Sequence, residues 1–250
     1  MMIFKHNHID YKVAIHQPID ISLPIKNTPD STRAWFVPVP KIEPVMENGF
    51  IGDVNKGGAV NFKNVTFNPH GNGTHTECVG HISKEKYSIN DCLQNYFFMA
   101  TLISVTPQNI NGDQVITQNV LANAFTTQIK PKALIIRTLP NIEKKKNCNY
   151  SGTNPPYLST DAVAFILEHQ IDHVLVDVPS FDKENDGGKV AAHHLFWNYP
   201  KQPKIHRTIT ELVYVPNNVV DGDYFLNLMI AAFDLDATPS KPILYPIERI

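Results

Sequence analysis

The sequence has few cysteines and no long apolar run. Its 250 residues include only Cys78, Cys92 and Cys148, with no CxxC pair, so no disulfide framework is expected and the thiols fit a reducing compartment. No stretch approaches the roughly 18 apolar residues that span a bilayer. The opening segment MMIFKHNHIDYK lacks the apolar core of a signal peptide. We therefore expect a cytoplasmic protein with no membrane partner.

Basic runs and phosphate-binding motifs are also scarce. The formal net charge is −2 and the one basic run is Lys144–Lys146, so the chain has no electrostatic footprint for nucleic acid. It contains neither a GxGxxG motif nor a Walker-type loop, the usual nucleotide-binding signatures. With 42% hydrophobic and 18% charged residues, the composition is typical of a globular protein with a real core. We expect residues 1–250 to form a single domain.

The hydrophobic pattern predicts a mixed α/β fold in which strands dominate. It lacks the regular alternation of strands and helices that marks a doubly wound sheet. Helices are predicted at 117–125, 158–170 and 189–197. Strands are predicted at 13–23, 34–39, 59–67, 97–105, 133–138, 173–178, 209–215 and 224–235.

The most informative segment is HGNGTHTECVGH, residues 70–81. Imidazole nitrogens together with a carboxylate suit Zn²⁺, Mn²⁺ or Fe²⁺. Residues two apart on a strand share a face, so His75 and Glu77 are placed to hold one ion, and His81 has the same parity. His70 has the wrong parity, but a bend at Asn72-Gly73 would return it to the site. Isolated histidines are usually surface or hydrogen-bonded core residues, whereas this clustering favours a metal site.

A second half of the site is expected downstream, because one short segment seldom supplies a complete metal shell. His193 and His194 lie in the apolar run AAHHLFW, where a buried imidazole needs a partner, either a metal ion or a hydrogen bond. Neighbours on a helix diverge by about 100°, so we do not expect both to face the same ion. Glu211, in ITELVYV, is either on the solvent face of a strand or a ligand.

Together these residues resemble the cyclase family of metal-dependent hydrolases, which includes bacterial kynurenine formamidases (arylformamidases). The family hallmark HxGTHxDxPxH is matched by Gly73-Thr74-His75-x-Glu77-x-x-x-His81. Other family segments are resembled, in the same order, by IDISLPI (19–25), DVPSFD (177–182), HHLFW (193–197), ITELV (209–213) and ATPSKPIL (237–244). By this resemblance Asp177, Ser180 and Asp182 either support the site or form turns.

The chain departs from the hallmark at several positions. The first histidine would fall at position 71, where the chain has Gly71, and His70 stands one residue earlier. Glu77 replaces the family aspartate and Val79 the proline, while Leu212 follows Glu211 where the family has asparagine. Either a one-residue bulge restores the first ligand through His70, or that ligand is lost.

The resemblance implies a swivelling β/β/α-type domain with a central barrel-like sheet flanked by helices. It implies one or two divalent ions, Zn²⁺ in first place and Mn²⁺ as the alternative. One ion is assigned to His70, His75 and Glu77, and a second to His81, His193 and Glu211. The implied catalytic residues are Glu77, Glu211 and His194, the last as the group that passes a proton to the leaving nitrogen.

The implied reaction is hydrolysis of an amide (formamide-like), ester or lactone bond in a small molecule, by a metal-activated water. N-formylkynurenine, an intermediate of tryptophan catabolism, is the narrowest candidate substrate. Family members are commonly homo-oligomers, either dimers or tetramers. Trp35, Phe36 and Trp197 either line an aromatic substrate pocket or pack in the core.

Two other functional classes stay open at this point. A non-catalytic small-molecule-binding protein on the same scaffold would explain the loss of histidine at Gly71. A cupin-like metal oxygenase also places histidine and glutamate on strands, although the HHLFW segment has no natural place in it.

Overall fold

A seven-stranded mixed sheet that closes on itself forms the centre of the protein in the computed structural model, which describes residues 2–250. The β9–β12, β12–β14 and β14–β15 pairs are parallel, and the remaining neighbours are antiparallel. Around the barrel the strands are β17 (Ala237–Arg249), β16 (Gly222–Ile230), β9 (Phe97–Val105), β12 (Ala133–Thr138), β14 (His173–Val176), β15 (Thr208–Glu211) and β8 (His75–Glu77), which pairs again with β17.

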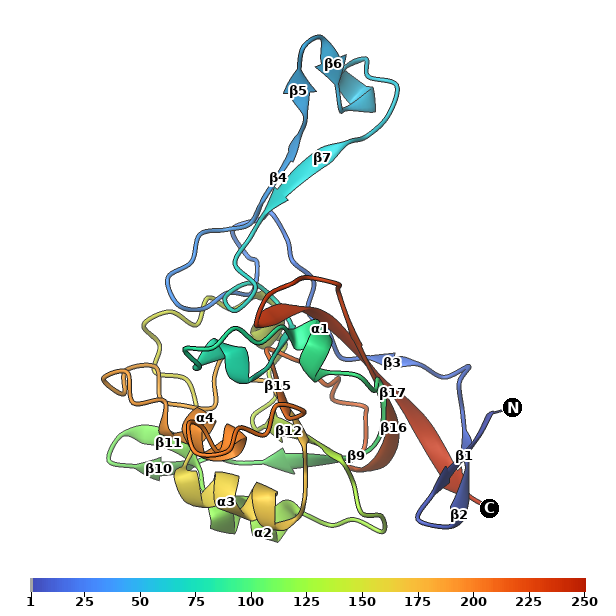
Figure 1. The fold of residues 1–250 in the computed structure, drawn as a ribbon, viewed down its shortest axis with the longest axis vertical. Coiled ribbons are helices and arrows are strands. Elements are labelled where there is room, and N and C mark those ends of the chain that lie inside the picture. The colour runs from blue at the N-terminus through green and yellow to red at the C-terminus, as the bar shows by residue number, and fades with distance from the viewer. Residues whose placement is uncertain (1) are drawn as a thin grey trace.

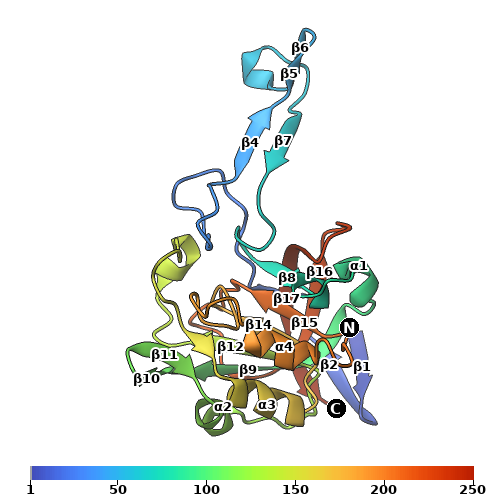
Figure 2. The same ribbon diagram turned by 60° about the vertical axis from the view of Figure 1, so that its left-hand side comes forward.

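Alternating side chains on the barrel strands build two cores, one on each face of the sheet. In β12, Ala133 and Ile135 pack into the barrel interior, whereas Leu134 and Ile136 pack toward the helices. The helices are α1 (Ile89–Cys92), α2 (Gln118–Ala124), α3 (Thr160–Glu168) and α4 (Ala191–Trp197). Figure 2 shows α2 and α3 side by side at one end of the molecule. A strand-rich α/β fold with a central barrel and flanking helices is thus confirmed.

Shorter elements extend the barrel. Three strands continue the sheet beyond β17, namely β1 (Met2–His6), β2 (Ile9–Val13) and β3 (Ile19–Asp20). A small separate sheet contains β10 (Gln108–Ile110), β11 (Asp113–Ile116) and β13 (Tyr157–Leu158). Two 3₁₀ turns, η2 (Val79–His81) and η3 (Glu143–Asn147), lie in the connecting loops.

No helix among residues 2–250 combines the length and apolarity needed to cross a membrane.

A long arm, residues 41–66, projects away from the barrel (Figure 1). The strands β4 (Lys41–Pro44) and β7 (Lys63–Thr66) form its stem. Its tip contains β5 (Met46–Glu47), β6 (Phe50–Ile51) and the 3₁₀ turn η1 (Val54–Lys56). Gly52 is the only fully buried residue in the arm, so the arm has no hydrophobic core of its own.

Most predicted elements are found, with three corrections. The predicted strand 13–23 is largely absent, because only Val13, at the end of β2, and β3 (Ile19–Asp20) are strand in that range. The predicted strands 97–105 and 133–138 match β9 and β12, and all three predicted helices are present with shorter ends. The predicted strand 34–39 is wrong, because Trp35 and Phe36 adopt left-handed backbone angles, with φ of 59° and 56°, in a loop. The predicted strand 59–67 is shorter, as β7, and all of β7 is exposed rather than half-buried, because it belongs to the arm.

The buried imidazole of His173, at the start of β14, provides a test of the fold. Its ring packs on Phe98, with centroids 4.0 Å apart, and its Nδ1 lies 2.9 Å from Thr208 Oγ1. Burial lowers the pKa of His173 to about 4, below the usual unfolded value of about 6.5. Between pH 4 and 6.5 the His173 side chain is therefore neutral in the folded protein and protonated in the unfolded chain. The free energy of unfolding consequently decreases as the pH falls from about 6.5 to 4.

We expect His173→Gln to remove roughly 2 to 4 kcal/mol of this acid sensitivity. Urea unfolding between pH 7.5 and 4 would measure it, with His16→Gln, at an exposed position, as the control. Parallel stability profiles for the wild type and His173→Gln would contradict the assignment.

Candidate metal centre

Strand pairing brings three of the predicted ligands to one face of the sheet. β8 is antiparallel to β15, with His75 directly opposite Glu211 and Glu77 opposite Ile209. Side chains on opposite residues of paired strands lie on the same face. His75, Glu77 and Glu211 therefore converge, and each is almost fully buried.

The first group of ligands is buried and includes a histidine from α4. His75 Nε2 lies 3.3 Å from Glu211 Oε2, and His193 Nε2 lies 3.2 Å from Glu77 Oε1 and 3.9 Å from Glu211 Oε1. We call His75, Glu77, Glu211 and His193 the inner group.

The second group lies beside the inner group and is partly open to solvent. His70 Nδ1 is 2.9 Å from Glu77 Oε2, and His81 Nε2 is 3.8 Å from the same oxygen. The side chains of His70 and His81 are 21% and 32% exposed, so an ion has access from solvent. We call His70, His81 and Glu77 the outer group, which shares Glu77 with the inner group.

The local backbone explains how the outer histidines reach Glu77. Gly73 has φ of 71°, a left-handed angle that glycine adopts without steric cost. The chain bends there and returns His70 to the site, as the Asn72-Gly73 dipeptide predicts. The extended backbone does not persist to His81, because residues 79–81 form the 3₁₀ turn η2. His81 reaches Glu77 from that turn rather than through strand parity.

Hydrogen bonds orient the inner imidazoles with Nε2 toward the carboxylates. His75 Nδ1 lies 3.2 Å from the Gly73 carbonyl oxygen, and His193 Nδ1 lies 2.5 Å from Asp182 Oδ2. Such partners fix the tautomer and ring orientation of metal-binding histidines. The Phe181 backbone N–H donates to Glu211 Oε1 at 3.2 Å and holds that carboxylate in place.

The buried charges shift one another's pKa values strongly. Burial raises the pKa of Glu77, but the positive charge of His81, the close approach of the His193 imidazole and a hydrogen bond with His70 outweigh burial and hold the pKa well below its usual range. Burial raises the pKa of Glu211, and repulsion by Glu77 raises it further. Burial lowers the pKa of His193, but Asp182 and Glu77 outweigh it and raise the pKa to about 10. Clusters of strongly shifted groups are typical of functional sites.

The donor atoms fit a divalent cation. His75, Glu77 and Glu211 each offer one ligand atom, and these atoms lie within 4.8 Å of one another, as do those of His70, Glu77 and His81. His75 Nε2 and Glu77 Oε1 are buried without any hydrogen-bond partner, which is costly unless another group satisfies them. Imidazole nitrogens and carboxylate oxygens are the ligands of Zn²⁺ and Mn²⁺ sites.

The structure brings all six predicted metal ligands together but groups them differently from the expectation. The expected sets were His70, His75 and Glu77 for one ion and His81, His193 and Glu211 for another. Strand pairing instead places His75 with Glu211, and the ring of His70 lies closest to that of His81, with centroids 4.2 Å apart.

The predicted proton donor, His194, lies outside both groups. Its Nδ1 is 3.1 Å from the Tyr199 carbonyl oxygen and its ring packs near Tyr199. Among residues 2–250, no hydrogen bond or ion pair joins His194 to the side chains of the two groups. Adjacent residues on α4 point in different directions, so His193 enters the site and His194 does not.

Of the two aspartates in the segment DVPSFD, Asp182 contacts the site and Asp177 does not. Asp182 contacts His193 and accepts hydrogen bonds from the first backbone N–H groups of α4. Asp177 instead pairs with Lys145 at 2.8 Å and with Thr138. Trp197 is fully buried in the helix-side core.

Packing explains why position 71 holds glycine. A Cβ atom on Gly71 would lie 2.7 Å from both methyl carbons of Val37 and 3.2 Å from the Ala34 carbonyl oxygen. A histidine does not fit there unless this loop moves. His70, one residue earlier, supplies an imidazole to Glu77 in its place.

Sequence reasoning missed Asp236, whose Oδ2 lies 2.7 Å from His70 Nε2 and 3.7 Å from His81 Nδ1. It belongs to the segment DLDATPS, directly before the closing strand. Asp234 and Asp236, which lie just before that strand, were the only hint in the sequence. Their distance along the chain from residues 70–81 matches no metal-ligand motif, so the hint could not be used.

The chain is similar to proteins of a known family. The family described as "Putative cyclase" matches residues 19–183. The kynurenine formamidase of Bacillus mycoides (strain KBAB4) is 31% identical over 192 residues, which cover 76% of this chain and 82% of that protein. The kynurenine formamidase of Bacillus anthracis is 28% identical over 231 residues, covering 92% and 97%.

Two solved structures share the fold. An isatin hydrolase bound to the product analogue thioisatinate superposes with a TM-score of 0.66 at 13% identity, covering 93% of each chain. A potential metal-dependent hydrolase with cyclase activity superposes with a TM-score of 0.63 at 16% identity, covering 92% of this chain and 97% of the other.

Because Glu77 is common to both groups, we expect Glu77→Gln to abolish tight metal binding. Metal-stripped protein would be reloaded with Zn²⁺ or Mn²⁺ and dialysed, and the retained ions counted by plasma mass spectrometry. Glu168→Gln, which neutralises an exposed glutamate on α3, serves as the matched control. Wild-type metal content in Glu77→Gln would show that this carboxylate holds no ion.

Proposed function

The chain belongs to the cyclase family, and from this premise we propose that it is a metal-dependent hydrolase that cleaves an amide bond in a small aromatic substrate. The observation that carries the proposal is the pair of His/Glu groups that share Glu77, in which His75 Nε2 and Glu77 Oε1 are buried without a hydrogen bond. We propose one or two ions, Zn²⁺ in first place and Mn²⁺ as the alternative. A bound dication of this kind lowers the pKa of a coordinated water and polarises a carbonyl oxygen.

The residues of the chain supply orientation and proton handling. Asp182 holds the His193 ring through Nδ1, so that Nε2 faces the carboxylates. Burial and then Glu77 raise the pKa of Glu211, and a carboxylate with a raised pKa is suited to accept and return a proton. Glu77, whose pKa is held low, stays ionised and is suited to binding cations.

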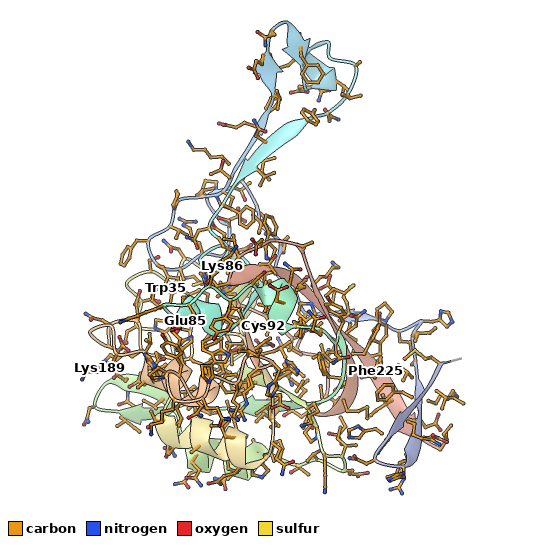
Figure 3. All side chains as sticks on the ribbon, viewed as in Figure 1. Trp35, Glu85, Lys86, Cys92, Lys189 and Phe225 are labelled. Carbon is orange, nitrogen blue, oxygen red and sulfur yellow. The ribbon has the colours of Figure 1, made fainter. Side chains whose placement is uncertain are left out.

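Two aromatic side chains, on a loop that is hydrogen-bonded to the segment of His70, support an aromatic substrate. Trp35 and Phe36 follow Ala34, whose backbone N–H donates to the Gly71 carbonyl oxygen at 3.0 Å. This bond ties their loop to the segment that carries His70. Phe36 is 79% exposed, and Figure 3 shows Trp35 on the body of the protein below the arm. A left-handed backbone at two successive aromatic residues is strained and is more common at functional sites than elsewhere.

Within this substrate class we propose N-formylkynurenine first, after the formamidase relatives. Isatin, named for a structural neighbour, is a cyclic aryl amide and the second candidate. A formamide on an aromatic amine and a cyclic aryl amide both place the scissile nitrogen on a benzene ring. Lactones and simple esters are further candidates.

Neither alternative class gains support. A non-catalytic binding protein was suggested by Gly71, but His70 brings an imidazole within 2.9 Å of Glu77. A cupin-like oxygenase does not agree with membership of the cyclase family.

The three cysteines are free thiols, which supports the proposal of a cytoplasmic, reducing environment.

Hydrolysis assays on metal-stripped protein with Zn²⁺ or Mn²⁺ added back would test the function. We expect turnover of at least one N-formyl aromatic amine or cyclic aryl amide. His193→Gln should lower the rate at least about a hundredfold, because a ligand is lost. His194→Gln, the neighbouring substitution on α4, should keep most of the activity. Metal-loaded wild type that is inactive on every aryl amide would refute the proposed reaction.

The arm supports the further proposal that the protein is a homo-oligomer. Large apolar side chains along it are 44–58% exposed, namely Met46, Phe50, Val54, Val60, Phe62 and Val65. A two-stranded extension without a core is marginally stable alone, and exposed apolar clusters commonly mark interfaces. We propose that a second copy of this chain covers the arm.

We expect Phe62→Ser combined with Val65→Ser to lower the molar mass measured by light scattering after size exclusion. Val220→Ser, at a 74% exposed residue outside the arm, should leave the mass unchanged. A wild-type protein that is monomeric at micromolar concentration would rule out the proposed oligomer.

A further inference from the structure

Asp236 is held beside the outer group by sheet hydrogen bonds rather than by a flexible loop. β17 begins at the next residue, and Ala237 is paired with Glu77 across the β8–β17 ladder. The Cys78 backbone N–H donates to the Asp236 carbonyl oxygen at 3.0 Å. The position of the Asp236 backbone is therefore fixed relative to Glu77.

The Asp236 carboxylate closes a ring of four groups. Its Oδ2 lies 2.7 Å from His70 Nε2 and 3.7 Å from His81 Nδ1. On the other side, Glu77 Oε2 lies 2.9 Å from His70 and 3.8 Å from His81. Two imidazoles with centroids 4.2 Å apart are thus enclosed by two carboxylates. Asp236 faces the ring nitrogens opposite to those that face Glu77. Each imidazole can therefore bind an ion on the Glu77 side through one nitrogen and contact Asp236 through the other, as metal-binding histidines do with their outer partners.

The close approach of Asp236 depends on a glycine. A Cβ atom on Gly80 would lie 2.8 Å from the Asp236 Cβ and 2.4 Å from the Tyr87 carbonyl oxygen, both shorter than real contacts. The chain thus has no side chain at the point where Asp236 meets the turn that carries His81.

A comparison with Asp234 shows that proximity in sequence is not enough. The side chain of Asp234 is 72% exposed and pairs with Lys86 at 2.6 Å, which is an ordinary surface ion pair. Asp236 is 32% exposed, faces two histidines and lies beside the shared Glu77. The two aspartates therefore form a matched pair for a test.

We propose that Asp236 is a positioning residue for an outer metal position formed by His70, His81 and Glu77. It holds the ring of His70, which stands in for the histidine missing at position 71, so that the opposite ring nitrogen faces Glu77. The inference rests on the proposed metal-dependent function but is separable from it. The inner group is complete without Asp236. Loss of Asp236 should therefore empty or weaken one position and leave the other intact.

Calorimetric titration of metal-stripped protein with Zn²⁺, and separately with Mn²⁺, would test the inference. We expect two equivalents for wild type and for Asp234→Asn. Asp236→Asn should bind one equivalent normally and the other at least about tenfold more weakly. Visible absorption of Co²⁺-loaded protein should change in Asp236→Asn and not in Asp234→Asn.

Near-ultraviolet circular dichroism would verify folding, and Asp236→Ser would replace the asparagine variant if that variant fails to fold. Wild-type stoichiometry and affinity in Asp236→Asn would overturn the inference and leave the proposed function standing. A wild type that binds a single ion, with Asp236→Asn binding it equally well, would also overturn it. Absence of any metal binding by the wild type would instead refute the proposed function.

Discussion

The buried carboxylate of Glu77 is the constraint on which the site depends. A carboxylate removed from water is strongly destabilised unless charges or hydrogen bonds compensate. His193 approaches one oxygen of Glu77, and His70 and His81 approach the other. The chain segments that carry these histidines must therefore meet at β8 for the folded protein to tolerate Glu77 there.

The closed barrel makes that meeting possible. β8 is only three residues long, yet it pairs with β15 on one side and β17 on the other. One neighbour supplies Glu211 and the other brings Asp236, while α4 supplies His193 after a loop from β14. An open sheet would leave one edge of β8 without a partner and would separate these groups. Closure thus joins the early and late parts of the chain at one short strand.

The residues that make up the two His/Glu groups were accessible from the sequence, but their grouping was not. Three histidines and a glutamate within residues 70–81 are a local signal, and the strand parity of His75 and Glu77 holds in the structure. The opposition of His75 and Glu211 depends on the register between β8 and β15, which local patterns do not encode. Asp236 was missed for the same reason, since a non-local ladder places it beside Cys78 and Glu77.

The fold shows the same division between local and non-local information. The predicted strands 97–105 and 133–138 are buried, strongly apolar runs, and they match β9 and β12. The arm was not predicted, because alternation in 59–67 indicates a half-buried strand only when a core lies beneath it. Residues 34–39 were misassigned because their aromatic and β-branched composition favours a strand, whereas Trp35 and Phe36 adopt left-handed angles.

The packing of Val37 and Ala34 against Gly71 links two segments that are far apart in the sequence. A single exchange of Gly71 for histidine would collide with this loop, so the usual family arrangement is not one substitution away. A variant with histidine at position 71 would also need a smaller residue at position 37, or a shift of the loop that carries Trp35 and Phe36. Ligand choice and the shape of the neighbouring loop are therefore expected to change together among close relatives.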